Sequence, residues 1–107
     1  MAKLERKLRG DFGEILNNIT DGILNGSASA SLEELSDFEC GNSRCSVRVF
    51  ERYSYFGGNR VSLTVTLFQN GEDIYLSGIT AGGSQAMFFK MNTVGEEAFL
   101  EKLEELL

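Results

Sequence analysis

The dipeptide Asn70-Gly71 is the feature that most constrains the fold of this chain. Asn-Gly between two runs of alternating apolar and polar residues is the strongest short-range signal for a β-hairpin with a two-residue type I′ loop. Closing the loop on Gln69 and Glu72 places the apolar residues of both strands on one face, in the opposite pairs Leu67 and Ile74, Val65 and Leu76, and Leu63 and Gly78. An antiparallel sheet is therefore expected in the middle of the chain.

Two further turn signals extend this hairpin into a meander. Gly57-Gly58-Asn59 is expected to close a three-residue loop, which places Glu51 and Tyr53 on the apolar face. A loop over 41–44 sets the register of the preceding strand, with the expected pairs Cys40 and Cys45, Asp37 and Arg48, Glu33 and Arg52, Leu35 and Phe50, and Glu34 and Glu51. The pattern predicts four antiparallel strands between residues 27 and 80.

A helix is expected on each side of the meander. Over residues 11–25 apolar side chains recur every three or four residues, Asp11 and Glu14 have the spacing of a capping box, and a glycine follows the last apolar residue. A second capping box at Thr93 and Glu96 precedes the apolar stripe of a C-terminal helix, made of Phe99, Leu100, Leu103 and Leu106.

Two segments are compatible with more than one structure. Residues 2–9 fit a helix by the spacing of Leu4 and Leu8 and a strand by alternation, and Gly10 just before the helix cap favours an edge strand. Residues 85–91 alternate, which favours a fifth meander strand. The expected fold is α+β, a curved antiparallel meander of four to six strands with an N-terminal and a C-terminal helix packed on one face. We expect a single domain over residues 1–107.

Composition limits the function classes. The net charge of −6 is the wrong sign for binding nucleic acid or an anionic membrane. The chain contains no His, so it lacks the usual general base, a hydrolase triad and a four-ligand zinc site. We expect no signal peptide, because no apolar stretch follows the charged residues at positions 3–6, and no membrane span, because no run of about 18 apolar residues occurs. We therefore expect a cytoplasmic protein with reduced thiols and without a metal or a cofactor.

Glu51 is the one misfit on the expected apolar face, and Glu34 is its expected neighbour. Two facing carboxylates in a dry site favour retention of a proton, which is how acid–base pairs and cation sites are made. Together with Tyr53 and Tyr55 they would line a cavity between helices and sheet. Alternatively the face opens to water here, or a bulge or an arginine partner resolves the charge.

The turn Gly82-Gly83-Ser84 offers successive backbone N–H groups to an anion, with Arg60 or Lys90 adding positive charge. Its spacing matches neither a Walker loop nor a dinucleotide-binding fingerprint, so an ordinary turn is the alternative. The candidate ligand-binding residues are Glu34, Glu51, Tyr53, Tyr55, Arg60 and Ser84, and none has a catalytic role.

Cys40 and Cys45 would lie near disulfide distance if they faced each other across a tight hairpin. One interpretation is a redox switch. The other is a pair of small apolar side chains in a reducing cytosol.

The outer face of the expected sheet is the second candidate site. Its registers align Leu35, Phe50, Thr66 and Tyr75 in one row, with Arg52 on one side and Arg48 and Phe68 on the other. Aromatic residues flanked by Arg are enriched at the cores of protein interfaces, although single apolar groups on an exposed sheet face are also normal. The leading hypothesis is a non-enzymatic interaction module that forms a homodimer or binds a protein partner. The alternative is a small-ligand binder, possibly an enzyme, with a cavity near Glu51.

Two stretches carry a resemblance to known sequences. One runs over residues 47–63 and includes Glu51-Arg52-Tyr53-Ser54-Tyr55, and the other runs over residues 79–100 and includes Ile79-Thr80-Ala81-Gly82-Gly83-Ser84-Gln85. They resemble an uncharacterised family of short bacterial proteins that carries only a domain-of-unknown-function label. The resemblance covers most of the chain. It implies neither a reaction nor a site, because the family has no assigned activity.

Overall fold

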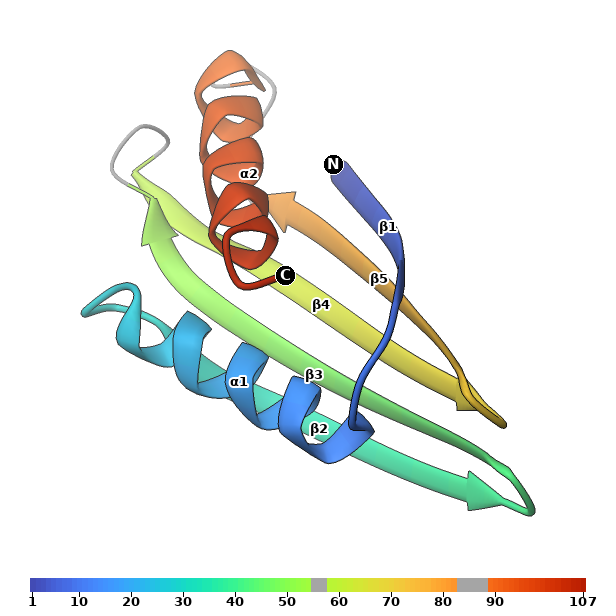
Figure 1. Cartoon of the computed structure of the whole chain (residues 1–107). Helices are drawn as coiled ribbons and strands as arrows, with labels where there is room; N and C mark the ends of the chain where they lie inside the picture. Colours follow the sequence, from blue (N-terminus) through green and yellow to red (C-terminus); the bar gives the residue numbers. More distant parts are fainter. Residues whose placement is uncertain (55–57, 83–88) are drawn as a thin grey trace.

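The chain folds into one curved antiparallel sheet with two helices (Figure 1). The computed structural model describes residues 1–54, 58–82 and 89–107, with side chains from residue 94 onward in the last range. The elements are β1 (Ala2–Leu8), α1 (Phe12–Asn25), β2 (Ser31–Cys40), β3 (Ser43–Ser54), β4 (Asn59–Asn70), β5 (Asp73–Gly82) and α2 (Phe89–Glu104). The strand order β1-β5-β4-β3-β2 leaves β1 and β2 at the edges. The predicted α+β class is confirmed.

Both helices lie on the same side of the sheet (Figure 1). In this view α1 runs along the β2–β3 side, while α2 packs on β5, β4 and β1. The core between the layers contains fully buried residues from every layer, among them Ile19 of α1, Leu63 of β4 and Leu103 of α2. We call the covered side of the sheet the inner face and the other side the outer face.

The N-terminal strand and helix match the predictions made from the sequence. Residues 2–8 form the edge strand β1, and Leu4 lies opposite Gly78 of β5. The predicted cap of α1 is confirmed, because the Asp11 side chain accepts a hydrogen bond from the backbone N–H of Glu14 at 2.9 Å.

The turn of the β4–β5 hairpin lies one residue later than expected, which shifts every cross-strand partner by two residues. Asn70 pairs with Asp73, and the loop is Gly71-Glu72. Gly71 has a φ of +62° while Glu72 has a negative φ, which is the pattern of a type II′ turn and not of type I′. Asn70 stays in its strand because its Oδ1 accepts a hydrogen bond from the Ser43 hydroxyl at 2.9 Å. The expected partners are wrong by two residues, and Leu67 faces Leu76, yet the apolar face is the expected one.

The β3–β4 register differs from the expected one by three residues, which turns β3 over. The connection closes between Ser54 and Asn59, and Phe50 lies opposite Leu63. Because side chains alternate along a strand, this odd shift buries Phe50 completely and moves Glu51 and Tyr53 to the outer face. The reason is energetic: burying a Phe is favourable by about 1.5–3 kcal/mol, whereas a buried carboxylate is costly.

The β2–β3 hairpin has the two-residue loop Gly41-Asn42, and its cross-strand register again differs from the expected one by two residues. The predicted ion pair of Asp37 and Arg48 is nevertheless present as a diagonal contact, with Oδ1 and Nη1 2.9 Å apart. The other expected opposite pairs are wrong. The observed pairs are Cys40 with Ser43, Phe38 with Cys45, Leu35 with Arg48 and Glu34 with Val49, and a bulge follows between Leu32 and Glu34.

The C-terminal third is more helical than its alternation predicts. Helix α2 already begins at Phe89, so the strand expected over 85–91 is wrong for residues 89–91, while residues 83–88 lie outside the described residues. Thr93 and Glu96 therefore lie inside α2 and do not cap it. Glu96 is buried instead. Its carboxylate accepts a hydrogen bond from the N–H of Gly82 at 2.7 Å and lies 3.0 Å from the amino group of Met1.

Candidate functional site

A row of outward-facing side chains crosses four strands on the outer face. The registers place Phe38 of β2 opposite Cys45 of β3, Cys45 opposite Phe68 of β4, and Phe68 opposite Tyr75 of β5. Phe38 is 64% exposed, Tyr75 45% and Phe68 39%. We call these four residues the outer-face row. Among the described residues, neither helix packs against this side of the sheet (Figure 1).

An open hollow lies at the β5 end of the outer-face row. It has a volume of about 420 Å³, and its lining residues are Glu5, Arg6, Lys7, Thr66, Phe68, Tyr75, Leu76 and Ser77. Lys7, on β1, continues the row beyond Tyr75, with its Nζ 5.8 Å from the centre of the tyrosine ring. We call this feature the β5 hollow.

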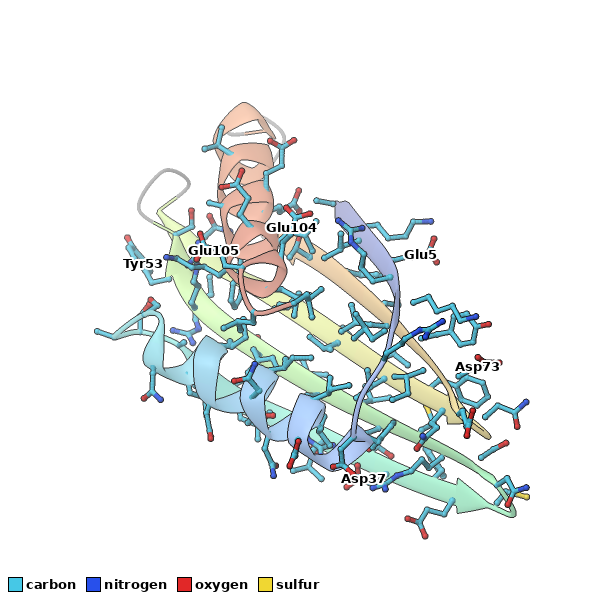
Figure 2. The ribbon with its side chains drawn as sticks, in the orientation of Figure 1. Glu5, Asp37, Tyr53, Asp73, Glu104 and Glu105 are labelled. Atoms are coloured by element: carbon cyan, nitrogen blue, oxygen red, sulfur yellow. The ribbon has the colours of Figure 1, made fainter. Side chains whose placement is uncertain are left out.

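The centre of the outer face carries no charged residue. The positions around the middle of β3, β4 and β5 hold small, β-branched, aromatic or cysteine side chains: Cys45, Val47, Val49, Thr64, Thr66, Phe68, Tyr75, Ser77 and Ile79. Charged residues lie only around this block, with Lys3, Glu5 and Lys7 on β1, Glu34 on β2, Glu51 and Arg60 toward one end, and Asp73 at the other. Figure 2 shows Glu5 and Asp73 on the β1–β5 side. A polar rim around an uncharged centre is the anatomy of a protein interface.

The residues predicted for the interface divide between the two faces. Thr66, Phe68 and Tyr75 lie on the outer face as expected. Leu35, Arg48, Phe50 and Arg52 lie on the inner face, because the odd register shift turned β3 over. Phe50 is therefore a core residue. Phe38 and Cys45 take the places in the row that Leu35 and Phe50 were expected to fill.

Only some of the residues predicted for a ligand site lie in contact with one another. Arg60 pairs with Glu51, with Nε 2.9 Å from Oε1, and its Nη2 also donates to the Ser31 hydroxyl at 3.1 Å. An arginine partner thus resolves the charge of Glu51, which was one of the expected alternatives. The dry carboxylate pair is wrong, because Ser31 and not Glu34 lies opposite Glu51.

Of the other predicted ligand residues, Tyr53 lies opposite Arg60 in the β3–β4 register, and Glu34 lies opposite Val49. Glu34 is exposed, and its carboxylate accepts a hydrogen bond from the N–H of Leu35 at 3.0 Å. Tyr53 lies on the outer face and is 42% exposed. Tyr55 and Ser84 lie outside the described residues.

A family model matches the chain over residues 1–107 and describes a family of unknown function, DUF6054. The chain belongs to DUF6054. No curated protein matches it. In the part of this DUF6054 member that the structure describes, no three His, Cys, Asp or Glu side chains gather closely enough to hold a metal ion, and no helix is long and apolar enough to cross a membrane.

Three arginines lie on the inner face of β3 in this DUF6054 chain, and the ring contacts of two of them were not predicted. Arg44 stacks on the ring of Phe12 with 4.1 Å between guanidinium carbon and ring centre, and Arg52 stacks on Phe99 at 4.6 Å. Burial lowers the pKa of the Arg52 guanidinium below its ordinary value. The regular spacing of these arginines and Arg48 was visible in the sequence, and only the assignment to a face was wrong.

Arg48, the third of these arginines, forms an ion pair on the inner face. Its side chain is only 12% exposed and meets Asp37 through two hydrogen bonds, of 2.9 and 3.4 Å. Hydrogen bonds from Arg48 and from Ser46 hold the pKa of Asp37 below its usual range. This pair ties the edge strand β2 to β3.

The two cysteines of this DUF6054 member are free, with Cys40 exposed and Cys45 partly buried. They do not face each other as expected, because Cys40 lies opposite Ser43 and Cys45 lies opposite Phe38. Cys45 instead belongs to the outer-face row.

Proposed function

We propose that this chain is a non-enzymatic interaction module that associates with a second copy of itself through the outer face, as a two-fold homodimer. The observation that carries this proposal is the outer-face row, whose three aromatic residues stand exposed on the face opposite both helices. Aromatic residues are enriched at interface cores, and exposed apolar patches on soluble proteins mark interaction sites.

The size of the outer face supports the proposal. A stable interface buries about 800 Å² on each partner. The molecule measures 47 × 24 × 22 Å, and a face bounded by its two longer dimensions is larger than that area. A two-fold dimer is the simplest assembly, since closed two-fold symmetry is the commonest form of homo-oligomer.

The alternative function, small-ligand binding between helices and sheet, has less support. Its defining residues Glu51 and Tyr53 lie on the outer face. The inner position that faces the helices in their place is occupied by Phe50, which is fully buried against other core side chains.

The proposal includes a location in the bacterial cytoplasm. The two free cysteines support a reducing compartment, where thiols persist. Fractionation of a bacterial host with an antibody against the chain tests this part, and recovery outside the cytoplasm would contradict it.

Sedimentation equilibrium tests the dimer. The wild-type chain is expected to dimerise at micromolar concentration, whereas the variant Phe68→Glu with Tyr75→Glu remains folded and monomeric, because two carboxylates in the interface would be desolvated without partners. The matched control is Leu35→Glu with Val94→Glu, two side chains of similar exposure, 49% and 46%, outside the outer face. This control should dimerise as wild type does. A wild-type chain that is monomeric at high micromolar concentration, or a control as impaired as the test variant, contradicts the proposal.

A further inference from the structure

We propose that the two copies pair as knob and hollow, with Phe38 of each copy filling the β5 hollow of the other. The inference rests on the proposed dimer and specifies its geometry. Phe38 and the β5 hollow lie at opposite ends of the same outer-face row. A surface that carries a knob at one end and a hollow at the other is complementary to its own reversed copy.

The required symmetry axis follows from the strand order. Two sheets stacked face to face are related by a two-fold axis that lies between them. An axis that runs parallel to the strands and passes between β3 and β4 places β2 over β5 of the partner and β3 over β4. Phe38 then lies over the Tyr75 position of the partner, and Cys45 lies over Phe68.

Phe38 has the character of a knob. At 64% it is the most exposed aromatic side chain among the described residues. The hollow offers it matching walls, since the aromatic residues Phe68 and Tyr75 are among its lining residues. Aromatic side chains packed edge to face or in offset stacks gain stability beyond the area that they bury.

The charges at the two sheet edges favour the same arrangement. β2 carries Glu33, Glu34, Asp37 and Glu39 and no basic residue, whereas β1 carries Lys3, Arg6 and Lys7 with the single acid Glu5. Lys3 and Glu34 stand at opposite ends of one outer-face line through Ile79, Thr64 and Val49. The proposed axis carries Lys3 beyond β2 of the partner, beside Glu34, so that the basic edge meets the acidic edge.

The competing arrangements bring like charges together. An axis across the strands would lay the acidic strand β2 on its own copy and would keep Phe38 away from the β5 hollow. Pairing of two β2 edges into a continuous sheet also juxtaposes acids, and the bulge between Leu32 and Glu34 interrupts the edge. Knob and hollow is therefore the arrangement in which both shape and charge are satisfied.

A mixing experiment tests the geometry. Phe38→Ala removes the knob, and Ser77→Trp fills the hollow, so each variant alone should dimerise poorly. We expect a loss of about tenfold for each contact and about a hundredfold for the dimer, because the contact occurs twice. In a mixed dimer, the intact Phe38 of one copy enters the open hollow of the other, and the filled hollow meets the truncated side chain. Native mass spectrometry, which resolves the three dimers by mass, should show the mixed dimer in excess over both homodimers.

Two further variants and the behaviour of the wild type separate the outcomes. Leu35→Ala, an exposed apolar truncation on the inner side of the same strand, should leave dimerisation unchanged. Thr66→Phe is a second way to fill the hollow if Ser77→Trp lowers the melting temperature. A wild-type chain that never dimerises overturns the proposed function itself. A wild-type dimer that Phe38→Ala leaves unchanged, or a mixture without preference for the mixed dimer, overturns only the knob-and-hollow pairing.

Discussion

Leu103 of α2 packs directly on Gly78 of β5, so closely that a Cβ at position 78 would overlap the leucine side chain. This contact brings the C-terminal helix onto the middle of the sheet, where Leu103 is fully buried. Gly22 of α1 has the same relationship with Leu106. The two glycines thus let the C-terminal residues approach both a strand and the other helix.

Gly78→Ala is therefore expected to destabilise the fold by about 1–3 kcal/mol, because an added methyl group in a filled core forces the helix away from the sheet. Urea unfolding measures the difference. Gly13→Ala is the matched control, since a Cβ there meets only the Asp11 carboxylate at 3.4 Å and Ala favours the helix. Equal effects of the two substitutions would mean that α2 does not press on β5.

The stability effects of substitutions at Phe50 and Tyr53 show which side chains of β3 lie on the inner face. Phe50 is fully buried, so Phe50→Ala should cost about 3–5 kcal/mol of unfolding free energy. Tyr53→Ala should cost less than about 1 kcal/mol, because the side chain is 42% exposed on the outer face. Urea unfolding of both variants decides between the observed register and the one that the turn signals predict, in which the two costs would be reversed.

The strands, α1 and the α+β class could be predicted because each follows from a local pattern. Alternation revealed the meander, and the Asp11 cap with its apolar stripe revealed α1. The turns were less informative, because a glycine marks where a loop lies but not how many residues it contains. Errors of two residues at Gly41 and Gly71 did not change the faces, whereas the error of three residues after Ser54 exchanged them.

The candidate site depended on that one register. Phe68 and Tyr75 were placed correctly because β4 and β5 kept their faces. Phe38 and Cys45 were missed, and Phe50 was included, since both errors follow from the loop after Ser54. The turn signals do not take into account that burying Phe50 is more favourable than burying Glu51. A search for the register that gives the most apolar inner face would have placed β3 correctly.

The ion pair of Asp37 and Arg48 should make part of the stability depend on pH. Hydrogen bonds from Arg48 and Ser46 lower the pKa of Asp37 in the folded state, so its contribution is fully present above the unfolded pKa of about 3.9 and is lost as the pH falls through the lower folded value. Asp37→Asn should therefore destabilise the chain at pH 7 and show a shrinking deficit below about pH 4. Urea unfolding across this range measures the deficit, with Glu33→Gln as control because Glu33 accepts its hydrogen bond from the neutral Ser31 hydroxyl. A deficit for Asp37→Asn that is the same at pH 7 and at the acidic end would show that the carboxylate contributes nothing through its charge.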